Sequence, residues 1–493
     1  MATTHGSLSD SPLSNADLAP TRPDQRTWGT YDIAALWIGL SIVITTYTLA
    51  SGLITAGMTW WQALLTVSLG NLIVLIPMLL NAHPGTKYGI PFPVLARASF
   101  GVKGANVAAM ARALVACGWF GIQTWIGALA LDTLMTTLTA SWADLTGHRA
   151  IAFAAFWLLQ VAIIMRGMEG VRRLERYAAP LLLGGSAGLL SWGFSAGDGI
   201  GNVFSASSRL IADDQSFWSL FAPGLAANIG YWITLSLNIP DFTRFAKNQR
   251  SQLVGQSIAM PLTMTGFSFI GIAVTSATVV VYGEPIWDPV ALIARLLGDL
   301  PVLLVLAMII VVIAQISTNM AANVVSPSND FSNLSPRSIS FRLGGIITAV
   351  IGIISFPWKL YEDVGAHIFT WLVGYGSLLA AFAAVMIVDY WILRRTVLDV
   401  DDLYRPEGRY RFSGGYNVPA LVAVLVAILP VIPGFLNAAT TEGGVVADPT
   451  FLDELYRYGI FVTFGLAAAL YFGLTRMGWG ATAPRGVPGA ATD

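Results

Sequence analysis

The sequence predicts an all-α integral membrane protein of twelve transmembrane helices. The first ten are expected to form two inverted five-helix repeats (5+5), in which helices 1 and 6 are broken. Apolar stretches of about 20 residues, enough to cross a bilayer core of ~30 Å, recur along the whole chain. Two of these stretches carry polar or helix-breaking residues near their middle. Lys and Arg residues are concentrated in alternate connecting segments, as expected for loops on opposite sides of a membrane.

Composition excludes several other classes of protein. Apolar residues make up 55% of the 493-residue chain and charged residues 11%, too few charges to cover a large soluble surface. The net charge of −1 leaves no basic face for nucleic acid. The single cysteine, Cys117, cannot form an intrachain disulfide. We expect residues 1–30 and 481–493 to be disordered cytoplasmic tails of a single transmembrane domain, residues 31–480.

The predicted spans follow one another in order, and their positions set the topology. With both termini inside, most Lys and Arg residues fall in inner segments, so the positive-inside rule places both tails in the cytoplasm. The expected location is the plasma membrane. The outer segments then carry only Arg149, Arg209, Arg295, Lys359 and Arg457. Boundaries are expected to be accurate to about four residues. The spans begin near Tyr31, Met58, Lys103, Ala150, Leu174, Phe217, Ser257, Pro301, Ser340, Gly365, Asn417 and Gly459.

Spans one and six are the two interrupted stretches. Thr45–Thr48 lies within the first, and Pro223 and Gly224 lie within the sixth. Interruptions inside a membrane are tolerated only beside protein or a water-filled cavity, and paired interruptions in two halves indicate the binding site of a transporter. We therefore predict one repeat over residues 31–196 and a second over 217–396, with helices 11 and 12 appended over 417–477.

Spans three and six offer aromatic surfaces and an amide for a planar ring. Trp119 and Gln123 are four residues apart, so they project from one helix face. An indole provides a stacking surface, and a Gln amide provides one acceptor and two donors. Trp232 could form an opposite stacking wall. Helix packing is an alternative role for both tryptophans, and a bond to a neighbouring helix is one for Gln123.

Span eight contains the densest polar cluster. Ser317 and Thr318 could hold a monovalent cation together with carbonyl groups from the broken part of span one, while Asn323 could present its amide to a ligand. The hydroxyl groups could instead bond to their own helix, and Asn319 could take the role assigned to Asn323.

Few ionisable residues are expected deep in the membrane. Asp132 and Asp389 fall near helix ends, and no chain of Glu, Asp and His indicates a proton relay. No nucleophile–base pair or metal-binding constellation is evident, so the sequence does not indicate an enzyme. A channel would not need a closed aromatic site at mid-depth. A transporter of amino acids would need a group that clamps a carboxylate, for which two tryptophans are poorly suited.

Several motifs, in the same order, resemble the nucleobase:cation symporter-1 family over nearly the full length of the chain. The similarity begins at Leu13–Leu18 and extends to span twelve. Its most specific segments are Arg26–Trp28, Gly85–Gly89, Ala96–Gly101, Asn238–Arg244 and Ala321–Pro327.

The resemblance implies a LeuT-like fold and a secondary active transporter that imports a planar nucleobase or related ring, such as uracil, allantoin or hydantoin, by alternating access. In that family the ring stacks between two tryptophans and bonds to a Gln and an Asn, which correspond here to Trp119, Trp232, Gln123 and Asn323. The implied Na+ site consists of the carbonyl groups of Gly39, Ile42 and Ala314 and the hydroxyl groups of Ser317 and Thr318; no other cofactor is implied. Proton coupling is an alternative. Val43 stands where some hydantoin transporters have a polar, substrate-facing residue, which weakens the assignment of one particular substrate. The three rings share the same amide edge, so the sequence does not rank them; uracil or allantoin is the expectation.

Overall fold

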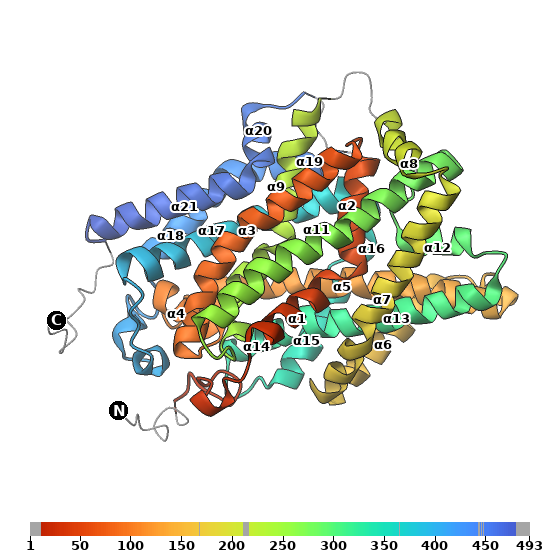
Figure 1. Cartoon of the computed structure of the whole chain (residues 1–493). Helices are drawn as coiled ribbons and strands as arrows, with labels where there is room; N and C mark the ends of the chain where they lie inside the picture. The colour runs from red at the N-terminus through yellow and green to blue at the C-terminus, as the bar shows by residue number, and fades with distance from the viewer. Residues whose placement is uncertain are drawn as a thin grey trace.

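The structure is a computed structural model that describes residues 11–166, 168–210, 216–363, 365–441, 444, 446 and 448–479. Its long helices run roughly side by side, and α1, α3 and α11 lie next to one another on one face (Figure 1). Within the described residues, nine helices are long and apolar enough to cross a membrane, and a bent pair provides a tenth. The start of α1 and the end of α21 lie at the same end of the bundle (Figure 1).

Helical structure occupies all twelve predicted spans. The two predicted spans that are not among these ten helices are α7 and α15, and α15 has only 14 residues. The elements are α1 (Thr30–Ser41), α2 (Ile44–Thr55), α3 (Trp60–Tyr88), α4 (Phe92–Phe100), α5 (Ala105–Leu138), α6 (His148–Arg166), α7 (Met168–Ala196), α8 (Ile200–Ala206), α9 (Phe217–Asn238), α10 (Pro240–Thr243), α11 (Gln249–Tyr282), α12 (Pro289–Leu296), α13 (Pro301–Asn323), α14 (Val325–Leu334), α15 (Phe341–Ile354), α16 (Pro357–Leu360), the π-helical η4 (Gly365–Leu372), α17 (Val373–Ile387), the π-helical η5 (Val388–Leu393), α18 (Val418–Ile428), α19 (Ile432–Thr440), α20 (Phe451–Arg457) and α21 (Gly459–Arg476).

Span one is broken as predicted, although the break lies just before the threonine cluster. Helices α1 and α2 meet at an angle of 55° across Ile42 and Val43. Val43 is extended, with φ −143° and ψ 155°, and its N–H donates to the carbonyl of Ser41 over 3.0 Å. Its N–H therefore does not bond to the carbonyl of Gly39, which an unbroken α-helix would require.

The prediction of a break in span six is wrong. Helix α9 is continuous across Pro223 and Gly224. Asn228 donates its side-chain N–H to the Gly224 carbonyl of its own helix over 2.8 Å. A Cβ atom on Gly230 would lie 2.4 Å from the carbonyl oxygen of Leu372 in η4. Gly230 therefore allows a close approach between helices, and Asn228 forms a hydrogen bond within α9. Neither residue unwinds the helix.

Three further features differ from the sequence-based expectation. Helix α11 begins at Gln249, eight residues before the predicted start of span seven, because the Asn248 side chain accepts from Ser251 N over 2.9 Å and caps the helix. Span eight divides at Val324 into α13 and α14. Span ten begins in the π-helical η4.

The prediction of a disordered N-terminal tail is wrong for residues 11–29, and residues 1–10 and 481–493 lie outside the described residues. Leu18 is fully buried, and its carbonyl accepts from the hydroxyl of Tyr404 over 2.7 Å. The carbonyl of Leu13 accepts from Arg97 in α4 over 2.8 Å. A polar segment can thus be fixed by its backbone carbonyl groups, which composition does not reveal.

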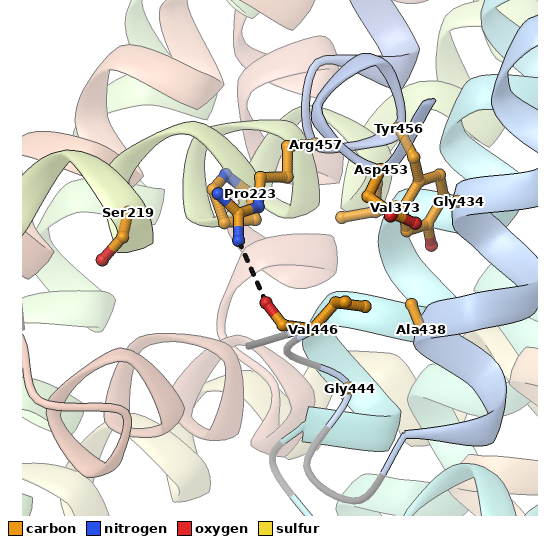
Figure 2. Close-up of a pocket in the computed structure, with 10 residues that line it drawn as sticks. All are labelled: Ser219, Pro223, Val373, Gly434, Ala438, Gly444, Val446, Asp453, Tyr456 and Arg457. Atoms are coloured by element: carbon orange, nitrogen blue, oxygen red, sulfur yellow. Dashed lines mark hydrogen bonds between the residues drawn. The ribbon is translucent and has the colours of Figure 1, made fainter. Parts of the chain in front are cut away.

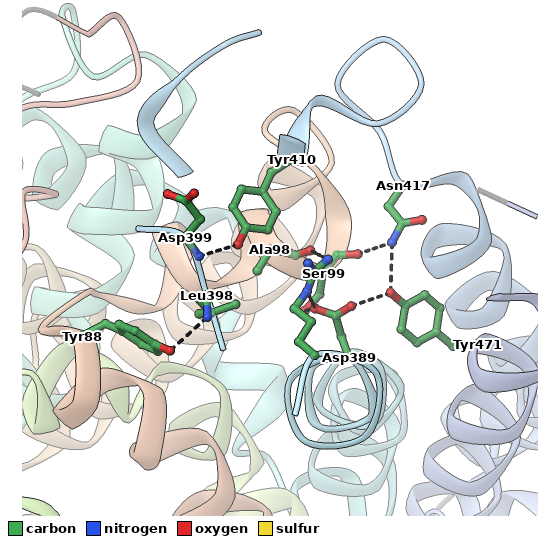
Figure 3. A network of polar contacts seen from close by, with 10 residues as sticks. Tyr88, Ala98, Ser99, Asp389, Leu398, Asp399, Tyr410, Asn417 and Tyr471 are labelled. Carbon is green, nitrogen blue, oxygen red and sulfur yellow. Dashed lines mark hydrogen bonds and ion pairs between the residues drawn. The ribbon is translucent and has the colours of Figure 1, made fainter. Parts of the chain in front are cut away.

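A polar network joins α4, η5, α18 and α21 around the buried carboxylate of Asp389 (Figure 3). Its oxygens accept from Ser99 over 3.1 Å, from Arg394 over 2.7 Å and from Tyr471 over 2.8 Å. Asn417 donates to the carbonyl of Ser99 over 2.6 Å and to the hydroxyl of Tyr471 over 3.1 Å. Asp389 therefore connects spans ten and twelve to the short helix α4.

A buried ion pair joins α5 to α14. Arg112 Nη1 lies 3.2 Å from Asp330 Oδ2, and both side chains are almost fully buried. Loss of one partner of a buried pair leaves an uncompensated charge and costs about 3–5 kcal/mol. We predict that Asp330→Leu lowers the Tm of the detergent-purified protein strongly, whereas Arg112→Leu/Asp330→Leu restores most of it. Asp24→Ala, in an exposed pair with Arg22, is the control. A double variant no more stable than the single one would contradict the prediction.

Candidate functional site

One pocket contains all four predicted ring-binding residues. About 360 Å³ of its space, part of it open to solvent, is not filled by protein atoms. Helices α5, α9 and α13 and the break between α1 and α2 contribute to its wall. The lining residues are Leu40, Val43, Thr45, Trp119, Gln123, Tyr231, Trp232, Thr234, Leu235, Thr318, Ala322 and Asn323.

Three aromatic side chains, Trp119, Tyr231 and Trp232, line the pocket. The ring of Tyr231 is 5.3 Å from that of Trp119 and 4.9 Å from that of Trp232, at interplanar angles of 87° and 85°. The position of Trp119 is fixed by a hydrogen bond that its Nε1 donates to the hydroxyl of Tyr375 over 3.0 Å. Trp232 packs edge-on against Trp37 at 5.2 Å. Tyr231 therefore contacts both of the indoles that line the pocket.

The polar atoms of the pocket include several without a partner in the described part of the chain. Gln123 Oε1 and Trp232 Nε1 are buried and make no hydrogen bond there. Asn323 uses its Nδ2 to donate to Asn319 Oδ1 over 3.0 Å. Asn319 itself does not line the pocket, so the alternative in which it replaces Asn323 as the pocket residue is not favoured. A ligand with both N–H and C=O groups could satisfy these unpaired atoms.

The five predicted cation ligands lie on two elements that contact each other, α1 with the residue after it and α13. Gly39 is exposed and the other four residues are buried. The carbonyl of Ile42 would bond to Thr46 N in an unbroken helix, but Thr46 N donates to the carbonyl of Val43. The hydroxyl groups of Ser317 and Thr318 make no hydrogen bond to any described residue. Carbonyl and hydroxyl oxygens that have no hydrogen-bond donor are suitable ligands for a hard cation.

Tyr231 and Thr45 are pocket residues that the sequence reasoning missed. The hydroxyl of Tyr231 lies 2.8 Å from Thr45 Oγ1 and 3.1 Å from Thr46 Oγ1, both in the first turn of α2. These bonds tie the helix that begins at the break in span one to the aromatic wall on α9. The sequence identifies the threonine cluster as an interruption of span one, but its spacing does not indicate that Tyr231 is its partner.

A second pocket lies between the start of α9, α19, α20 and the junction of η4 with α17 (Figure 2). Its polar groups are already paired: Arg457 contacts Glu454 at 2.6 Å, and Asp453 accepts from Asn437 over 2.8 Å. The hydroxyl of Tyr456 donates to the carbonyl of Thr370 in η4 over 3.2 Å. This pocket therefore supports the packing of α20 against η4 and offers no unpaired group comparable to those around Gln123.

Comparison with known proteins gives a consistent result. The sequence profile of the family described as "Permease for cytosine/purines, uracil, thiamine, allantoin" matches residues 20–462. A purine-uracil permease of Arabidopsis thaliana is 43% identical over 94% of this chain and 78% of its own length. The allantoin permease of Bacillus subtilis (strain 168) is 40% identical over 85% of this chain and 86% of its own length.

A solved structure extends the similarity to three dimensions. Mhp1, described as a nucleobase-cation-symport-1 family transporter in a closed conformation with bromovinylhydantoin bound, superimposes with a TM-score of 0.77 at 26% identity. The match covers 94% of this chain and 96% of Mhp1. The resemblance inferred from the sequence motifs is confirmed.

The hydroxyl of Tyr231 provides a direct test of how the pocket depends on the broken helix. Tyr231→Phe keeps the ring and removes the bonds to Thr45 and Thr46, at a cost to stability of about 1 kcal/mol. We predict that it also weakens binding of a planar ring to the purified protein. Tyr471→Phe, which loses bonds to Asp389 and Asn417 far from the pocket, should lower Tm without changing ring affinity. Equal ring affinity in wild type and Tyr231→Phe would contradict this role.

Proposed function

Because the chain belongs to the family of permeases for cytosine and purines, uracil, thiamine and allantoin, we propose that it is a secondary active transporter that imports uracil, allantoin or a hydantoin together with a cation, Na+. The chain is thus a multi-pass membrane permease and not an enzyme. Uracil and allantoin are favoured, since relatives at 43% and 40% identity are described as purine-uracil and allantoin permeases.

The observation that carries the substrate proposal is the pocket itself. Trp119 and Trp232 provide stacking surfaces, while Gln123 and Asn323 provide amide groups, and all four line one pocket. Stacking would supply most of the affinity. The amides would supply selectivity, because an analogue without the matching N–H or C=O leaves a buried amide unpaired at about 1–3 kcal/mol. No carboxylate clamp of the kind an amino acid needs is present among the lining residues.

The cation proposal rests on the oxygen atoms of Gly39, Ile42, Ala314, Ser317 and Thr318. Thr318 belongs to this set and also lines the ring pocket, so the two sites share a residue. An ion held between α1 and α13 would fix the end of the broken helix against the wall that carries Asn323. Each ligand would then bind better in the presence of the other, by the same factor in both directions. Proton coupling would leave uptake independent of sodium.

Alternating access follows from the proposed architecture. Residues 31–196 and 217–396 would form the two inverted repeats, and one helix group would rock against the other around the fixed site. The distribution of Lys and Arg supports cytoplasmic termini. The position of α1 and α21 at one end of the bundle agrees with an even number of spans (Figure 1).

The amide groups are tested by truncation. We predict that Gln123→Ala and Asn323→Ala each reduce uptake of radiolabelled uracil or allantoin into cells to less than about a tenth, since each leaves ring polar groups unpaired. Gln256→Ala removes a fully buried glutamine on α11, outside the pocket, and should retain most of the uptake. If either pocket variant, expressed at the level of the wild type, took up the ring as fast as the wild type, the substrate assignment would be wrong.

The hydroxyl of Thr318 is tested through sodium dependence. Thr318→Ala should raise the sodium concentration for half-maximal uptake several-fold, because one oxygen ligand worth about 1 kcal/mol is lost. Thr348→Ala, in which the lost hydroxyl bonds to the Gly344 carbonyl within α15 and to the thiol of Cys117, should leave that concentration unchanged, because none of these residues lines the pocket. If wild-type uptake were the same with sodium replaced by choline, the ion assignment would be wrong.

A further inference from the structure

Behind Asn323 lies a chain of three amide side chains that crosses from α13 to α6. Asn323 Nδ2 donates to Asn319 Oδ1 over 3.0 Å, and Asn319 Nδ2 donates to Gln160 Oε1 over 2.7 Å. Gln160 and Asn319 are fully buried and neither lines the pocket. Only Asn323 therefore links this chain to the ligand space.

A backbone carbonyl fixes the direction of the chain. Asn319 Nδ2 also donates to the carbonyl oxygen of Phe120 over 3.0 Å. A carbonyl can only accept, so the atom of Asn319 that faces it must be nitrogen. The remaining atom, Oδ1, can only accept, and the atom that Asn323 turns toward it must be nitrogen as well.

Gln160 is oriented by the same carbonyl through a hydroxyl group. Thr124 donates its single hydrogen to the carbonyl of Phe120 over 2.6 Å. Its oxygen is then an acceptor for Gln160 Nε2 at 2.9 Å. The other end of Gln160, Oε1, consequently faces Asn319 Nδ2, which agrees with the direction set by the first contact. All three amides thus have one orientation in which every contact pairs a donor with an acceptor.

This chain leaves Asn323 with a defined polarity. One hydrogen of its Nδ2 is committed to Asn319, and its Oδ1 makes no hydrogen bond to any described residue. Rotating the Asn323 amide by half a turn would bring two acceptor oxygens together in a buried place. Unpaired or opposed polar atoms are costly there, so the flipped state is disfavoured.

We propose, on the basis of the proposed function, that Asn319 is a positioning residue, supported by Gln160, which holds the Asn323 amide so that Oδ1 selects a ring bearing N–H at that edge. A ring methylated at that nitrogen is rejected, because it offers no donor to Oδ1. Methylation at the other ring nitrogen affects a contact elsewhere in the pocket, where Gln123 Oε1 is a second unpaired acceptor.

The test compares the affinities of the detergent-purified full chain for a parent ring and its two N-methyl isomers, 1-methyl and 3-methyl. Uracil and hydantoin are both used as parents. The penalty of an isomer is the factor by which its affinity falls below that of the parent ring. In Asn319→Leu, this penalty should shrink at least about fivefold for one isomer and should be kept for the other. A factor of about five corresponds to about 1 kcal/mol, the lower end of the cost of an unpaired buried amide. Asn71→Leu is the matched control, since buried Asn71 donates only to the Val67 carbonyl of its own helix; it should keep both penalties.

Unchanged penalties in Asn319→Leu, or an equal reduction of both, would overturn the positioning role, because loosened packing affects both isomers alike. If Asn319→Leu does not fold, Gln160→Leu removes one of its acceptors and should change the same isomer's penalty in the same direction. Binding of neither parent ring to wild type would overturn the proposed function itself, and the positioning role with it.

Discussion

The break in span one is the constraint on which the rest of the structure depends. A transmembrane helix satisfies its own backbone, and opening it leaves carbonyl groups that need polar neighbours. At Ile42 and Val43 the chain does this deep in the bundle, with its N–H groups turned to nearby carbonyls. Tyr231 on α9 holds the following turn through Thr45 and Thr46. The ring pocket and the proposed cation ligands both lie beside this opening.

The pocket is lined by several polar groups that have no hydrogen-bond partner in the described part of the chain. Elsewhere in the described chain, buried hydroxyl groups commonly bond to their own helix, as Thr124 does to Phe120 and Ser377 to Val373. Around the pocket, by contrast, Gln123 Oε1, Trp232 Nε1 and the hydroxyl of Thr318 make no such bond. Unpaired groups cost stability unless a ligand satisfies them, so polar groups that lack a partner and line one pocket are candidates for contact with a ligand.

Much of this could be predicted from the sequence, since span positions depend on apolar length and Trp119, Gln123, Trp232 and Asn323 depend on residue type and family motifs. The tertiary partners could not. The break in span six was inferred from Pro223 and Gly224, but α9 stays helical because packing against its neighbours overrides the local preference. Tyr231 and the fixed residues before Thr30 were missed, because their roles depend on contacts with chain segments far away in sequence.

The central claim is that a ring and a cation bind together beside the broken helix. Its most direct test is the affinity of the purified wild-type protein for uracil or allantoin, measured by calorimetry with Na+ and with choline at equal ionic strength. The account predicts tighter ring binding in Na+, and an increase in Na+ affinity by the same factor when the ring is present. Ring binding of equal affinity in Na+ and in choline would contradict it.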